Sequence, residues 1–100
     1  MSHAINTCEV YYDTWRVSGE VKAKEAIELL VSLGMTVRED MDTAFWQSVG
    51  KLKAEIKRVS LADCCALALA QRTGATLVTA DHHEFDPIVE MNLCPITFIR

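Results

Sequence analysis

Residues 60–85 join a helix that lacks a polar face to an apolar strand, and each of the two elements carries one acid. Between residues 61 and 70 the only charged side chain is Asp63, and small and apolar residues run all the way round the helical wheel. A helix of this kind is covered by the protein on every side. The sequence therefore predicts an interior helix here.

A buried strand is predicted directly after this helix. Gly74 stands where a left-handed C-cap ends such a helix, and residues 75–80 form an unbroken apolar and β-branched run. That run predicts a strand buried on both faces, which favours a parallel sheet and an α/β fold. Asp81 follows at the carboxyl end of the strand, where open α/β sheets place their ligands.

The two acids, Asp63 and Asp81, have two interpretations. They could converge on one crevice, and a cluster of carboxylate oxygens is what Mg2+ or Mn2+ requires. Alternatively, Asp63 is the capping-box partner of Ser60, three residues earlier, and Asp81 caps a turn. Spacing alone leaves both interpretations open.

The same segment resembles the C-terminal half of PIN domains, including the VapC-type toxins of toxin–antitoxin pairs. The family pattern is an acid in a small-residue helix, a glycine, a hydrophobic strand ending in Thr-x-Asp, and an aromatic residue shortly after. In this chain the pattern reads Asp63, Gly74, Thr79, Asp81 and Phe85. The resemblance implies a PIN-like three-layer α/β/α fold with a small, mainly parallel sheet, and a metal-dependent ribonuclease activity.

Near the N-terminus, Glu9 lies on an otherwise apolar side of a helix expected over residues 7–16, which follows a short strand at residues 2–5. A carboxylate on such a side needs a partner. One interpretation is that Asn6 is the N-cap and that Glu9 bonds back to its amide. The resemblance implies instead that Glu9 is the metal-site Glu of the family.

A break and two elements are expected next. Ser18-Gly19 interrupts the first helix, and the apolar stripe of residues 20–33 predicts a second one. Residues 35–38 are a candidate for a short strand. These elements are expected to serve packing.

A third helix is predicted to begin at Asp42 or Thr43. Trp46 is expected to add width to its core face, which has helical spacing: Phe45, Val49, Leu52 and Ile56. The outward side carries four basic residues: Lys51, Lys53, Lys57 and Arg58. They could contact RNA phosphates, and the alternative is an ordinary solvated basic face.

The C-terminal residues complete the expected α/β order. His82-His83 does not predict a zinc site, because neighbouring histidines point apart and no second ligand pair has matching spacing. A short helix or turn is expected to begin at Asp86-Pro87, and residues 95–99 form a last strand. The connection is long enough for a crossover to a parallel neighbour.

The resemblance also has a gap. A PIN domain ordinarily opens with a hydrophobic strand ending in Asp and one or two helices, and that unit has no counterpart here. In the family this strand lies in the middle of the sheet, in the strand order 3-2-1-4-5. The resemblance transfers a metal-binding role to the following acids: Glu9, Asp63 and Asp81, with Glu84 or Asp86 as an accessory acid. Thr79 is expected to orient Asp81 through a hydrogen bond.

Composition sets wider limits. The chain has 100 residues, 50% of them hydrophobic, which suffices for one modest core. Its net charge of -4 argues against binding nucleic acid by general electrostatics, although bound cations change the field at a metal site. No segment predicts export or membrane insertion, and four cysteines without a C-x-x-C pair are expected to be reduced, so a cytoplasmic location is expected.

The leading interpretation is a single, incomplete PIN-like domain over residues 1–100 that acts as a VapC-type, Mg2+- or Mn2+-dependent endoribonuclease. Its expected partners are RNA, an antitoxin protein, and a second copy or other oligomer that covers the uncovered strand edges. The alternative is a catalytically inactive PIN-like binding or assembly module, which the missing Asp favours. Loss of an N-terminal segment, or an α/β domain unrelated to PIN whose acids are caps, are two further interpretations.

Overall fold

The computed structural model describes residues 1–79 and 82–99, with only the backbone of His82. The chain divides into two compact units, Met1–Asp40 (the N-terminal unit) and Met41–Arg100 (the C-terminal unit). None of the described helices combines the length and the apolar character that a membrane crossing needs.

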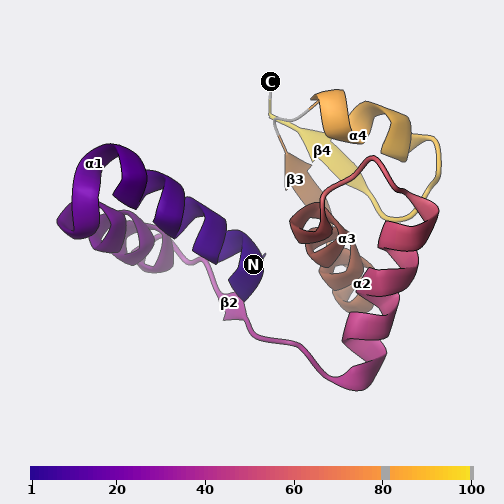
Figure 1. Cartoon of the computed structure of the whole chain (residues 1–100), viewed down its shortest axis with the longest axis horizontal. Helices are drawn as coiled ribbons and strands as arrows, with labels where there is room; N and C mark the ends of the chain where they lie inside the picture. Colours follow the sequence, from indigo (N-terminus) through magenta and orange to yellow (C-terminus); the bar gives the residue numbers. More distant parts are fainter. Residues whose placement is uncertain (80–81, 100) are drawn as a thin grey trace. The chain divides into compact units, whose positions relative to one another are not determined.

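The N-terminal unit is a helical hairpin with two short strands. It contains β1 (Ser2–His3), α1 (Ala4–Ser32) and β2 (Val37–Arg38), and the two strands pair in parallel. Figure 1 shows α1 folding back on itself. The turn lies at Gly19, whose φ of 87° and ψ of 177° fall in a region open almost only to glycine. The predicted break in the first helix is confirmed.

The start of α1 differs from the prediction. The helix begins at Ala4, and its N-cap is His3, whose Nδ1 accepts a hydrogen bond from the amide of Ile5 at 3.1 Å. The other ring nitrogen lies 2.7 Å from the carbonyl oxygen of Asp40, to which it donates in the tautomer that this cap requires. The expected N-cap at Asn6 is wrong, because a buried histidine, 2% exposed, already caps the helix.

The C-terminal unit holds the hydrophobic core. Its elements are α2 (Thr43–Glu55), α3 (Leu61–Thr73), β3 (Leu77–Thr79), α4 (His82–Val89) and β4 (Ile96–Phe98). The two strands pair in parallel across the connection that contains α4, as predicted. Helix α2 packs against α3, and α3 packs against β3 (Figure 1).

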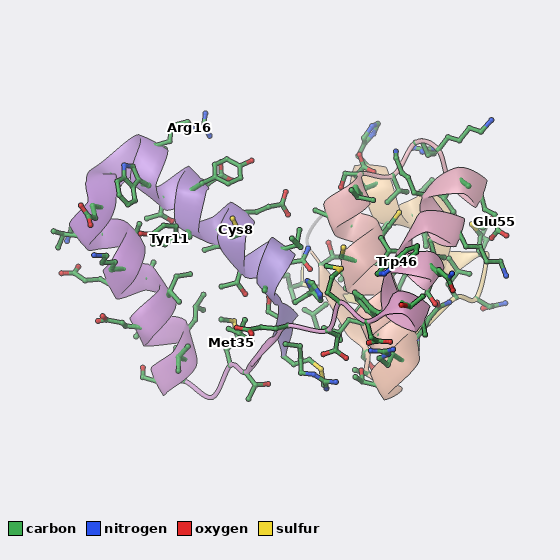
Figure 2. All side chains as sticks on the ribbon, turned by 60° about the horizontal axis from the view of Figure 1, so that its bottom comes forward. Cys8, Tyr11, Arg16, Met35, Trp46 and Glu55 are labelled. Carbon is green, nitrogen blue, oxygen red and sulfur yellow. The ribbon has the colours of Figure 1, made fainter. Side chains whose placement is uncertain are left out.

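Helix α2 has the predicted cap and core face. Asp42 is the N-cap, and its carboxylate accepts from the amide of Phe45 at 3.4 Å. The four residues predicted to face the core are all buried: Phe45, Val49, Leu52 and Ile56. Trp46, labelled in Figure 2, is on α2. It is 51% exposed, so its expected contribution to the core is wrong. It follows Phe45 by one position, which turns it about 100° away from the buried face.

Helix α3 is the interior helix. Ser60 is its N-cap, and Gly74 ends it in the left-handed conformation with φ 68°. Most of the middle of the helix is buried: Cys64, Cys65, Leu67, Ala68, Leu69 and Ala70. The predicted caps and the interior position of α3 are confirmed.

The strand after α3 is covered on one face only. Val78 is 57% exposed, whereas Leu77 packs against the core, so the prediction of a strand buried on both faces is wrong. No described element of the C-terminal unit covers the side that carries Val78. Helix α4 also begins earlier than expected, at His82, and contains Pro87 instead of starting beside it.

Among the described residues the strands form two separate two-stranded sheets, β1–β2 and β3–β4, both parallel. This pairing is compatible with the order 3-2-1-4-5 that the resemblance implies, in which strands 2 and 3 and strands 4 and 5 are neighbours. The helices and short parallel strands confirm an α/β architecture. The three-layer arrangement and a single domain over residues 1–100 stay predictions.

Candidate functional site

Asp63 is positioned by the first turn of α3. Its amide donates a hydrogen bond to Oγ of Ser60 at 3.1 Å, which is one half of the capping box that the spacing predicts. The side chain of Asp63 is half-buried, at the helix end where the backbone dipole favours a negative charge. Because the cap uses the amide, it leaves the metal-ligand interpretation of the carboxylate intact.

Glu9 lies within the first arm of α1 and is half-buried. The interpretation of Glu9 as the capping-box partner of Asn6 is wrong, because Asn6 lies inside the helix. Glu9 belongs to the N-terminal unit and Asp63 to the C-terminal unit. Their convergence on one metal ion stays a prediction.

Asp81 lies outside the described residues. Thr79 is the last residue of β3, and its carbonyl oxygen accepts a hydrogen bond from the amide of Ile99 at 3.0 Å, which ties this strand end to β4. Of the two accessory acids in α4, Glu84 is half-buried and Asp86 is exposed. The hydrogen bond expected from Thr79 to Asp81 stays a prediction.

Within the described part of the chain, no three His, Cys, Asp or Glu side chains lie close enough together to hold one metal ion. The predicted set of Glu9, Asp63 and Asp81 includes a residue outside that part. The chemistry of the set, carboxylate oxygens without sulfur or imidazole, is that of a hard divalent cation such as Mg2+ or Mn2+.

Comparison with protein families finds the PIN domain over residues 1–88. The chain belongs to the PIN domain family. PIN domains are generally nucleases that use divalent metal ions. Comparisons with curated proteins and with solved structures found no match.

The four basic residues of this PIN domain have different surroundings. Lys51 is exposed on α2. Lys53 is half-buried, and its ammonium donates to the carbonyls of Lys57 and Val59 at 2.8 and 2.7 Å. Helix α2 ends at Glu55, so Lys57 and Arg58 lie in the following turn and not on its outward side. Lys53 closes this turn, a role that its sequence position did not reveal.

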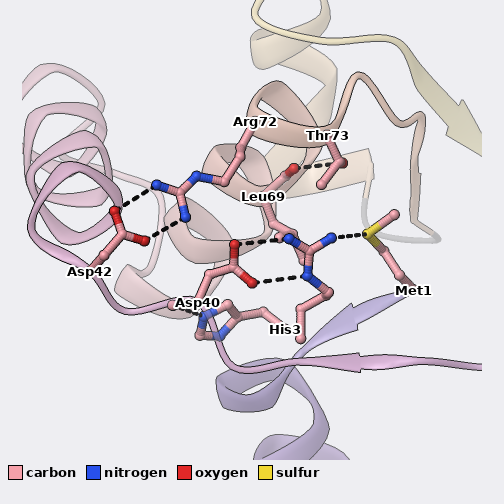
Figure 3. Close-up of polar contacts among 8 residues, drawn as sticks. Met1, His3, Asp40, Asp42, Leu69, Arg72 and Thr73 are labelled. Carbon is pink, nitrogen blue, oxygen red and sulfur yellow. Dashed lines mark hydrogen bonds and ion pairs between the residues drawn. The ribbon is translucent and has the colours of Figure 1, made fainter.

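An ion pair that sequence reasoning missed joins the ends of two helices. The guanidinium of Arg72, in the last turn of α3, binds both carboxylate oxygens of Asp42 at 2.6 and 2.7 Å (Figure 3). Its central carbon lies 5.2 Å from the ring centre of Phe45. The only signal in the sequence was a basic residue near a helix C-terminus, where the backbone dipole favours it. This PIN domain uses the pair to hold α3 on α2.

Proposed function

We propose that this PIN domain is a metal-dependent endoribonuclease of the VapC toxin type, in which Glu9, Asp63 and Asp81 bind Mg2+ or Mn2+. The observation that carries the proposal is the family match over residues 1–88, which includes all three acids. The half-buried position of Asp63 beside a capped helix end supports it, since a ligand must be held in place before the metal arrives.

A divalent ion at such a site lowers the pKa of a bound water and neutralises charge on the phosphate. Backbone hydrogen bonds of this chain hold the segments that carry two of the proposed ligands. The Ser60 cap fixes the first turn of α3, and with it the backbone of Asp63. The hydrogen bond from the amide of Ile99 to the carbonyl of Thr79 fixes the end of β3. Asp81 follows Thr79 by two residues.

The alternative is a catalytically inactive PIN domain that binds RNA or assembles with a partner. The two functions differ in one measurable property, which is metal-dependent hydrolysis.

The partners of the proposed nuclease are RNA, an antitoxin protein and a second copy of the chain. Strand β3 bonds to β4 through the amide of Leu77 and the carbonyl of Thr79. The backbone groups of Val78, between them, therefore point to the opposite edge. Within the described residues β4 is the one strand beside β3. Edges of this kind pair with other chains, which supports an oligomer.

The test is cleavage of a mixed RNA pool with Mn2+ or with chelator. We expect cleavage with Mn2+ and none with chelator, and a loss of at least about 100-fold in Asp63→Asn and in Asp81→Asn. Glu90→Gln, which changes an exposed acid just after α4, is the matched control and should cleave like the wild type. Equal cleavage by the wild type and both Asp variants would identify a contaminating nuclease and reject the proposal.

A further inference from the structure

Pro87 removes one backbone hydrogen bond from the interior of α4. In an α-helix the carbonyl of residue 83 accepts from the amide of residue 87, and proline has no amide hydrogen. Pro87 therefore leaves the carbonyl of His83 without its intrahelical donor. Arg58 supplies the replacement, because its Nη2 donates to that carbonyl at 3.1 Å.

The backbone on both sides of Arg58 is held as well. Lys53 donates to the carbonyl of Lys57 at 2.8 Å and to that of Val59 at 2.7 Å. Val59 is 0% exposed, and its amide donates to the carbonyl of Ile56 at 3.2 Å. Figure 1 shows this loop between α2 and α3 running beside α4. Arg58 is thus an exposed cation with a fixed backbone and a tethered side chain.

The hydrogen bond to His83 occupies only a small part of the donor capacity of the Arg58 guanidinium. Arginine carries five N–H donors in a planar fork, and the bond to His83 uses one of them. The side chain is exposed, and among the described residues it makes no second hydrogen bond, so further N–H groups stay available to a ligand. A planar fork that is already oriented suits a phosphate, because less side-chain freedom is lost on binding.

Arg58 also lies close in the chain to two of the proposed ligands. It precedes the Ser60 cap by two residues and Asp63 by five. Its acceptor, His83, follows Asp81 by two residues. In a chain with a net charge of -4, an arginine near these acids in the sequence adds to the positive charge that a metal ion supplies to a phosphate.

We infer that Arg58 is a substrate-binding residue, whose guanidinium binds a backbone phosphate of RNA beside Asp63 while α4 holds it in place. This inference rests on the proposed nuclease function and deepens it. It singles out Arg58 from the basic residues, because Lys53 closes the turn. Within the described part of the chain, no hydrogen bond holds the exposed side chains of Lys51 and Lys57.

The test measures binding separately from cleavage. Fluorescence anisotropy of a short, fluorescein-labelled single-stranded RNA of mixed sequence is recorded in chelator over a range of salt concentrations. We expect Arg58→Gln to bind roughly fivefold more weakly than the wild type, with the salt slope reduced by about 0.7. Lys22→Gln, at an exposed position of α1 outside the candidate RNA-binding residues, is the charge-matched control and should change the affinity by less than about twofold.

A second variant separates substrate binding from a purely structural role. Pro87→Ala returns an amide donor to the carbonyl of His83, which competes with Arg58 for this oxygen and weakens its hold on Arg58 without removing the charge. We expect weaker RNA binding in Pro87→Ala with no loss of thermal stability. If Arg58 only fastens α4, Arg58→Gln will lower the melting temperature and leave the affinity for RNA unchanged, which overturns the inference.

The remaining outcomes are also decisive. A wild-type protein that does not bind the RNA overturns the inference. Binding that depends on Arg58 in a protein without metal-dependent cleavage upholds the phosphate contact and rejects the nuclease. DNA of the same sequence should show the same loss in Arg58→Gln, because the contact is to phosphate, and a loss confined to RNA would contradict that assignment.

Discussion

Arg72 holds Asp42, the N-cap residue of α2, through two parallel hydrogen bonds of 2.6 and 2.7 Å. The same guanidinium lies over the ring of Phe45, the first core residue of α2. One arginine near the end of α3 therefore contacts both the cap and the core of its neighbour. This relationship joins the C-terminal end of α3 to the N-terminal end of α2, the two helices that carry most of the core.

The Asp42–Arg72 pair predicts an acid-dependent stability. Hydrogen bonding to Arg72, followed by its charge, lowers the pKa of Asp42 from 3.8 to about 2. A carboxyl group with a lowered pKa stabilises the fold above its unfolded pKa, and that contribution is lost as the pH falls from about 4 to about 2. Urea unfolding across this range should show the loss in the wild type and a smaller one in Arg72→Met. Identical pH profiles would contradict the assignment.

The Ser60 cap is expected to matter for stability. Ser60→Ala removes the acceptor of the Asp63 amide and should lower the free energy of unfolding by about 1 kcal/mol. Ser48→Ala is the control, because Oγ of Ser48 donates to the carbonyl of Ala44 within α2 and caps no helix end, and alanine favours a helix. Chemical denaturation of both variants tests the difference, and equal stabilities would exclude a capping role.

Gly19 is expected to be required at the turn of α1. A side chain at φ 87° and ψ 177° is strained whatever space surrounds it, so Gly19→Ala should destabilise the hairpin by about 1–3 kcal/mol. Gly50→Ala is the opposite control, since it lies inside α2 with open space around it and should stabilise by about 0.5–1 kcal/mol. Hydrogen exchange of α1 peptides measures the first effect and thermal unfolding the second.

The cysteines should react in a fixed order. Cys8 is exposed, whereas Cys64 is fully buried, and burial raises the pKa of the Cys64 thiol. Since the thiolate is the reactive form, iodoacetamide near neutral pH should modify Cys8 first and Cys64 only on unfolding. Mass spectrometry of timed samples gives the order. Equal rates at the two sites would show that the core around Cys64 opens readily.

The edge of β3 that no described strand of the C-terminal unit pairs with should affect the oligomeric state. We expect sedimentation to show a dimer or larger oligomer, and Val78→Lys to shift it towards the monomer, because a lysine on an edge strand opposes pairing. Thr76→Lys, at an exposed position just before β3, is a control for added charge. A wild-type protein that sediments as a monomer at every concentration would reject the proposed pairing.

Local chemistry made several elements predictable. The Ser60 cap, the left-handed Gly74 and the break at Gly19 each depend on residues within one turn, so a single sequence contains the whole cause. The core face of α2 follows from helical spacing for the same reason. The acids of the candidate site were predicted from the pattern around Asp63 and Asp81, and their role as metal ligands stays a prediction.

Tertiary contacts decided the rest. His3 caps α1 because the carbonyl of Asp40, 37 residues away, orients its ring. Val78 is exposed because nothing described in the C-terminal unit covers that side of β3, although its own pattern is that of a buried strand. Pro87 is tolerated inside α4 because Arg58 satisfies the carbonyl that proline leaves. The sequence by itself therefore determined caps, breaks and periodic faces, which arise from neighbours along the chain. Only the tertiary structure decided which polar groups are satisfied by distant residues and which faces are covered, because those depend on atoms brought together by folding.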